Sequence, residues 1–122
     1  MSEGLSKPEE LRTRTKRFAL RIIRLFQHLP HSPDAQVLGK QLLRAGTSVG
    51  ANYRAAGRAR SKAEFVSKIG VVVEEADEVV FWLECLMESG IVKPDLLTSL
   101  LAEANELLAI FAASQRTARR SL

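Results

Sequence analysis

The sequence predicts an all-α protein, an up-and-down antiparallel four-helix bundle in a single domain. Three observations lead to this prediction. Apolar residues recur every three or four positions in four long segments, as on the buried face of a helix. Short stretches with proline or glycine separate the segments, and short connections are typical of antiparallel neighbours. Val, Ile and Thr alternate with polar residues nowhere, which argues against β-strands.

The first helix is expected over residues 8–29, after a flexible tail at residues 1–7. Ser6 and Glu9 have the spacing of a capping box, and Pro8 suits the first helical position. Pro30 stops the helix. Its apolar stripe consists of Leu11, Thr15, Phe18, Ile22, Leu25, Phe26 and Leu29.

The second helix is expected over residues 33–59, with Ser32 as its cap and Pro33 at its first position. It contains Gly46, Gly50 and Gly57, each of which costs a helix about 1 kcal/mol relative to alanine. A helix that accepts such residues usually gains from close approach of another backbone. The small residues therefore predict tight packing, either within the subunit or between subunits.

The third and fourth helices are expected over residues 62–89 and 94–117, followed by a flexible tail at residues 118–122. Ser61 and Glu64 again have capping-box spacing, Gly90 suits a helix C-terminus, and Pro94 opens the last helix. The third helix carries a wide apolar face and an acidic cluster between Glu74 and Glu78.

Charge is distributed unevenly along the chain. The net charge is +4, and residues 1–60 hold twelve Lys or Arg against four Asp or Glu. Residues 61–92 hold two basic and seven acidic residues. The folded protein is therefore expected to have a basic and an acidic side. The basic side suggests an anionic partner, although acidic and basic helices could also pair with each other.

Two rows of cations at helical spacing are the best functional candidates. Such rows often form only a solvated face, but two on adjacent helices favour contacts with nucleic-acid phosphates, because the guanidinium fork binds phosphate bidentately. Thr47 and Ala51 continue the second row. We predict a nucleic-acid-binding surface made of Arg14, Arg17, Arg21, Arg24, Lys40, Arg44, Arg54 and Arg58.

Two other readings remain open. In one, the protein is a structural or adaptor protein, and its arginines pair with Glu75, Glu78 and related residues within or between subunits. In the other, a bundle enzyme holds a metal at the acidic cluster of the third helix.

Ser48 and Asn52 lie close to the apolar side of the second helix, where a buried amide must be hydrogen-bonded. We expect Ser48, Asn52, Glu75 and Trp82 to have structural roles, such as fixing helix register.

The sequence shows no catalytic constellation, and we expect no enzyme, cofactor or metal site. The Glu-x-x-His pairs of di-metal bundles are absent, and His28 and His31 lie in one loop. Cys85 is the only cysteine, so no disulfide framework exists and a reducing, cytoplasmic setting fits. No stretch resembles a signal peptide or a membrane span, so no membrane contact is expected.

The segment from Gln41 to Leu86 resembles a bacterial family of four-helix bundles associated with intervening sequences of 23S ribosomal RNA genes. The matching pieces are QLLRAGTSVGANY, RARSKAEF and EEADEVVFWLE, and weaker similarity extends over nearly the whole chain. The family includes the accessory variability determinant of diversity-generating retroelements.

The resemblance implies a homopentamer without enzymatic activity. It also implies, from the retroelement member, a positively charged surface that engages nucleic acid and a reverse transcriptase; for this chain we predict salt-sensitive binding to RNA or RNA–DNA hybrids. Crowding of Phe81, Trp82 and Cys85 on the third helix independently favours a homo-oligomer. Together these observations predict a non-enzymatic, oligomeric, nucleic-acid-binding accessory protein.

Overall fold

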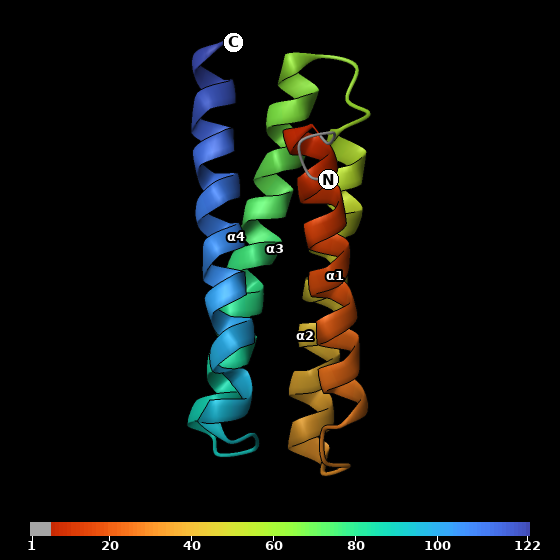
Figure 1. Cartoon of the computed structure of the whole chain (residues 1–122), viewed down its shortest axis with the longest axis vertical. Helices are drawn as coiled ribbons and strands as arrows, with labels where there is room; N and C mark the ends of the chain where they lie inside the picture. Colours follow the sequence, from red (N-terminus) through yellow and green to blue (C-terminus); the bar gives the residue numbers. More distant parts are fainter. Residues whose placement is uncertain (1–5) are drawn as a thin grey trace.

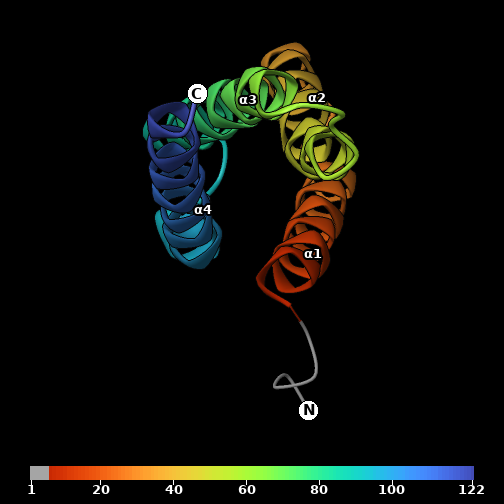
Figure 2. The same ribbon diagram turned by 90° about the horizontal axis from the view of Figure 1, so that it is seen from above.

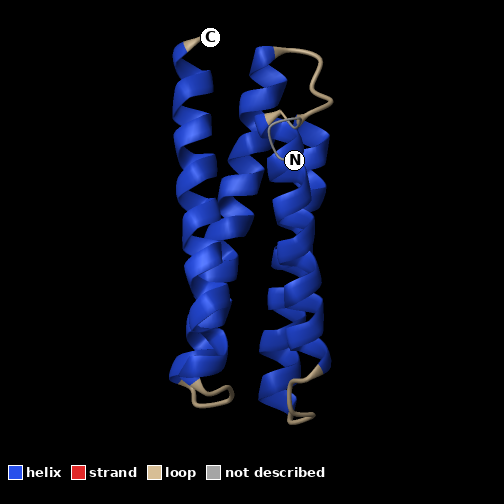
Figure 3. Cartoon of the chain, viewed as in Figure 1, coloured by secondary structure: helices blue, strands red, loops and turns tan. Residues whose placement is uncertain are grey.

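The chain folds into four long helices joined by short loops, in an up-and-down antiparallel bundle (Figures 1 and 3). This computed structural model describes residues 6–122. The helices are α1 (Lys7–Gln27), α2 (Pro33–Ala56), α3 (Lys62–Glu88) and α4 (Pro94–Arg120). The all-α prediction and the four-helix bundle are confirmed, and the described residues contain no strand.

The helices follow each other in chain order along an arc, with α1 and α4 at its two ends (Figure 2). Each helix packs against its neighbours in sequence, whereas the backbones of α1 and α4 approach each other at few positions. A ring contact crosses the bundle, since Tyr53 of α2 and Phe111 of α4 lie with their centroids 5.0 Å apart. The outer side of the α1–α2 pair, which is turned away from α4, is open to solvent (Figure 2). The candidate site lies on this side.

The predicted helix starts are largely as expected. Ser6 accepts a bond from the Glu9 backbone N–H at 3.2 Å and donates its own N–H to the Glu9 carboxylate at 2.9 Å, which completes a capping box. Ser61 accepts from the Glu64 backbone N–H at 3.1 Å. Ser32 occupies the N-cap position of α2 as expected, but its hydroxyl makes no capping bond to the backbone of the helix.

The helix ends differ more. α2 ends at Ala56 rather than residue 59, although Gly57, Arg58 and Ala59 still donate turn-type bonds to the last carbonyls of the helix. α4 continues to Arg120, so the flexible tail expected at residues 118–122 is instead mostly helical. At the N-terminus, Lys7 already belongs to α1, and the rest of the expected tail, apart from the capping Ser6, lies outside the described residues. Gly90 follows the C-cap of α3 with φ = 80°, where glycine is favoured.

Close contact between α1 and α2 explains the glycines of α2. A Cβ atom on Gly46 would lie 2.8 Å from Cγ1 of Ile22, too close for a side chain, whereas one on Gly50 would make an ordinary contact at 3.4 Å with the Thr15 carbonyl oxygen. Gly39 meets Leu29 in the same way, at 2.5 Å. The small-residue surface of α2 therefore serves packing within the subunit, which is one of the two alternatives that the sequence left open.

The apolar stripe of α4 is part of the core. By length and composition α4 could cross a membrane. However, its apolar residues at three- and four-residue spacing are buried against the other helices, which explains their presence in a bundle. These residues are Leu97, Leu100, Ala104, Leu107 and Phe111.

Candidate functional site

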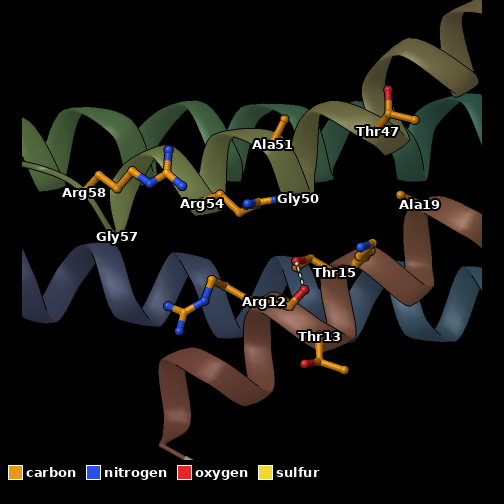
Figure 4. A pocket seen from close by; sticks show the side chains of 11 residues that line it. Arg12, Thr13, Thr15, Ala19, Thr47, Gly50, Ala51, Arg54, Gly57 and Arg58 are labelled. Carbon is orange, nitrogen blue, oxygen red and sulfur yellow. Dashed lines mark hydrogen bonds between the residues drawn. The ribbon is translucent and has the colours of Figure 1, made fainter.

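A groove with four cationic side chains runs along the outer side of the α1–α2 pair (Figure 4). Its volume is about 590 Å³. Arg12 and Lys16 come from α1, Arg54 from the last turn of α2, and Arg58 from the turn that follows it. The described residues that line the groove include no Asp or Glu. We call this feature the cationic groove.

Small and hydroxylated residues form the rest of the groove and let its two walls approach. Thr15 is fully buried, and its hydroxyl donates within α1, with the Leu11 carbonyl oxygen at 2.8 Å. Gly50 of α2 lies close to the Thr15 backbone of α1, and Figure 4 shows both residues on the facing sides of the two helices. The other residues that line the groove are Thr13, Ala19, Thr47, Ala51 and Gly57.

The helical repeat explains why the cations converge. Arg12 and Lys16 are four residues apart on α1, and Arg54 and Arg58 have the same spacing at the end of α2. Residues four apart lie on one face of a helix. Antiparallel packing then brings the first turns of α1 beside the last turns of α2. All four side chains are exposed, and none has an ion-pair partner among residues 6–122.

Arg14, a predicted phosphate ligand, is instead bound to two carboxylates of α4. Its Nε donates to Oε2 of Glu103 at 2.8 Å, its Nη2 donates to Oε1 at 2.7 Å, and Glu106 lies 2.8 Å from the same Nη2. These hydrogen bonds raise the pKa of Arg14 above its usual value, and the bond to Arg14 lowers the pKa of Glu103. Arg14 thus links the side chains of α1 and α4, two helices whose backbones approach each other at few positions.

Arg44 is also engaged within the subunit. Its guanidinium lies 3.1 Å from Glu75 and forms a second ion pair with Glu78 of α3. Trp82 joins this cluster, since its indole Nε1 donates to Oε1 of Glu78 at 3.1 Å. The cluster gives two of the four acidic residues at the centre of α3 a partner, and it gives Glu75 and Trp82 structural contacts.

The other predicted residues are spread over the surface. Arg54 and Arg58 line the cationic groove, whereas Arg17, Arg24 and Lys40 are exposed outside it. Arg21 donates to the Ser99 hydroxyl of α4 at 3.0 Å. The structure therefore does not bring the eight predicted cations together: two form ion pairs inside the subunit, two line the groove, and the other four lie elsewhere.

Asn52 satisfies its side chain within its own helix. Its Nδ2 donates to the Ser48 carbonyl oxygen at 2.9 Å, and both residues are half-buried. Within the described chain this bond does not fix α2 against another helix. No group of three or more His, Cys, Asp or Glu side chains in residues 6–122 is arranged to hold a metal ion.

Comparison with known proteins identifies the family of this chain. The model of the 23S rRNA-intervening sequence protein family matches residues 9–113. The chain belongs to this family. The match covers all of α2 and α3 and most of α1 and α4, so the shared pattern is that of the whole bundle.

A solved member of the S23 ribosomal protein family supports the same assignment. It is a protein of unknown function from Bacteroides thetaiotaomicron, with a TM-score of 0.84 and 31% identity, and the match covers 91% of this chain and 99% of that one. No curated protein matches the chain. The family resemblance noted from the sequence is therefore confirmed, and the structural neighbour shares the helical architecture.

Proposed function

We propose that this family member is a non-enzymatic accessory protein that binds the backbone of RNA or RNA–DNA hybrids through the cationic groove. The observation that supports it most is the convergence of Arg12, Lys16, Arg54 and Arg58 with no acidic residue in the lining. Cations without carboxylate partners remain available for phosphate oxygens, and neutralising phosphates releases counterions. Three of the four cations are arginines, whose planar guanidinium group can bind a phosphate through two hydrogen bonds.

The binding is expected to favour charge and shape over sequence. Among the described residues that line the groove, none is aromatic, so no base can stack there. Phosphate contacts set position on the nucleic acid, but they carry no sequence information. The affinity should therefore fall steeply with salt and vary little between sequences of the same form.

The test compares two triple variants of equal charge. Lys16→Gln/Arg54→Gln/Arg58→Gln is expected to weaken RNA binding at least about tenfold and to reduce the slope of log affinity against log salt by about 2. The control, Arg17→Gln/Arg24→Gln/Lys40→Gln, removes three exposed cations outside the groove. Fluorescence anisotropy at several salt concentrations measures both quantities.

Two outcomes of this titration would count against the groove. Equal losses in both variants would show that only net charge matters. Negligible binding of the unaltered protein at about 50 mM salt, where phosphate contacts are strong, would contradict nucleic-acid binding altogether.

A structural or adaptor role is the second candidate, and the exposed aromatic residues of α3 favour it. Phe81 is 54% exposed and packs edge-on against Trp82, with ring centroids 4.9 Å apart. A large exposed aromatic beside a partly buried one is typical of interface cores. We propose that this face contacts a sister copy in a homo-oligomer, with the pentamer suggested by the family resemblance.

Light scattering coupled to size exclusion tests this assembly. Phe81→Ser is expected to shift the mass toward the monomer, because it removes the most exposed aromatic side chain of α3. Leu96→Ser is the matched control, since Leu96 is 68% exposed and belongs to a different helix, α4. A monomeric mass for the unaltered protein would contradict the proposal.

The remaining expectations belong to the same proposal. A reverse transcriptase is a candidate protein partner, the location is cytoplasmic, and no residue is assigned to catalysis. The gene neighbourhood tests the partner, because a reverse transcriptase gene or a surrounding rRNA gene would distinguish the two contexts known for the family.

A further inference from the structure

A second pocket adjoins the cationic groove at the end of the bundle where α1 and α3 begin and α2 and α4 end. Its volume is about 700 Å³, within the range of pockets that hold small organic groups. We call it the end pocket. Arg12 and Gly57 line both the groove and the end pocket. A Cβ atom built on Gly57 would lie 3.8 Å from Nη1 of Arg12. The Arg12 guanidinium therefore lies close to Gly57, at the place where the groove and the end pocket meet.

The end pocket differs from the groove in its chemistry. Leu11, Tyr53, Phe65 and Ala118 give it apolar and aromatic walls from all four helices. The walls of the groove, by contrast, are cationic, hydroxylated or small. An apolar pocket suits a planar organic group rather than a phosphate.

The rim of the end pocket is cationic. Lys7, Arg60 and Lys62 line it together with Arg12, all four are exposed, and the described lining again contains no Asp or Glu. Positive charge thus continues from the groove to the mouth of the pocket. A ligand that matches both parts combines an anionic backbone with a flat, largely apolar group.

Tyr53 brings a hydroxyl-bearing side chain to the lining of the end pocket. Tyr53 is only 8% exposed, and its hydroxyl forms no hydrogen bond with residues 6–122. Every fully buried side-chain oxygen or nitrogen in these residues has a hydrogen-bond partner, so the Tyr53 hydroxyl oxygen is not fully buried. The hydroxyl therefore reaches solvent, and the end pocket is lined by this residue. Burial raises the pKa of Tyr53, so the hydroxyl stays protonated and can donate a hydrogen bond.

We propose that the end pocket receives an unpaired base at the end of a nucleic-acid strand whose phosphates follow the cationic groove. This inference rests on the proposed function and adds the form of the ligand: a duplex with a single-stranded overhang. The apolar walls shield the base, Tyr53 donates to one of its polar edges, and the rim cations hold the adjacent phosphates. A blunt duplex has no base free to enter.

Three RNA duplexes test this on the unaltered protein. One is blunt, one has a short overhang, and one has the same overhang with abasic residues, which keep the phosphates but lack the bases. The base-bearing overhang is expected to bind at least about fivefold more tightly than the other two, the lower end of what stacking one base contributes. Equal affinity for abasic and base-bearing overhangs would overturn the inference.

Two variants separate the pocket from the groove. Ala118→Trp fills the end pocket from α4, and it is expected to abolish the preference while leaving blunt-duplex affinity unchanged. Lys16→Gln/Arg54→Gln alters only the groove and is expected to weaken all three duplexes equally. Circular dichroism checks the fold. If Ala118→Trp does not fold, Phe65→Ala is used instead; it removes an aromatic wall of the end pocket and is expected to reduce the preference for the base-bearing overhang, and an unchanged preference would count against the inference.

The failures are distinguishable. If all three duplexes bind with one affinity, the inference about the end pocket is wrong and the cationic groove stands. If none binds at about 50 mM salt, the proposed function fails as well. A preference that Ala118→Trp retains would place the base elsewhere.

Discussion

Phe111→Ala is expected to lower the free energy of unfolding by about 3–5 kcal/mol, the usual cost of deleting a fully buried aromatic ring. Phe111 is 0% exposed in the middle of α4 and meets Tyr53 of α2 across the bundle. α4 lies at one end of the arc and packs mainly on α3. Loss of this ring therefore leaves a cavity and removes one of the contacts that hold α4 to the distant side of the core.

Urea denaturation at one fixed protein concentration measures this cost, because assembly would make stability depend on concentration. Phe111→Leu is the conservative comparison, since most of the buried volume remains, and we expect less than half of the loss. Leu96→Ala is the exposed control on the same helix, with an expected change within about 0.5 kcal/mol. A loss below about 1.5 kcal/mol for Phe111→Ala would contradict its central place in the core.

The helices could be predicted from the sequence because local signals determine where they start. The capping bonds of Ser6 and Ser61 and the opening prolines of α2 and α4 all depend on residues close in sequence. The ends were less certain for a physical reason. Turn-type bonds continue past Ala56 to Ala59, so the end of α2 is gradual. Basic residues in the last turn of α4 favour its C-terminus electrostatically and prolong the helix to Arg120.

The candidate site could be predicted only in part, because the fate of a cation depends on distant partners. Helical spacing identified Arg54 and Arg58, and the neighbouring Thr47 and Ala51, on what proves to be one wall of the groove. Spacing could not show that Arg14 meets Glu103, which lies 89 positions away in the sequence. Such pairs depend on tertiary packing.

Arg12 and Lys16 were missed for a related reason. The row of cations that starts at Arg14 is longer and gives the stronger pattern in the sequence. In the structure, however, Arg14 and Arg21 of this row contact α4, whereas Arg12 and Lys16 lie on the side of α1 that borders α2. The usable signal was the matching four-residue spacing of Arg12 with Lys16 and of Arg54 with Arg58. When two consecutive helices are antiparallel, the start of the first lies beside the end of the second. Cations with the same four-residue spacing at these two ends are therefore expected to face each other.

Gly46→Ala is expected to destabilise the protein by up to about 2 kcal/mol, because overpacking a core typically costs about 1–3 kcal/mol and the gain in helix propensity returns about 1 kcal/mol. The new Cβ would lie 2.8 and 2.9 Å from the two Cγ atoms of Ile22. Ile22 is fully buried, and its branched side chain has essentially one rotamer in a helix. The helices themselves must therefore move apart.

Gly50→Ala is the matched control, four residues further along α2. The nearest atom to its Cβ is the Thr15 carbonyl oxygen at 3.4 Å, an ordinary contact, so the gain in helix propensity should make this variant neutral or slightly stabilising. Urea denaturation of both, together with Ile22→Ala and the double variant, completes a mutant cycle. If contact with Ile22 is the cause, Gly46→Ala costs little once Ile22 is alanine; an equal cost in both backgrounds would refute it.

The same variant links packing to the cationic groove. The walls of the groove are the two helices whose separation Gly46 permits, so spreading them would move Arg12 and Lys16 away from Arg54 and Arg58. Gly46→Ala is therefore expected to weaken RNA binding several-fold, whereas Gly50→Ala, which keeps the spacing, is expected to bind with nearly unchanged affinity. Anisotropy titration of the two folded variants compares them. Equal affinities would mean that phosphates contact the cations one at a time, without dependence on the distance between the walls.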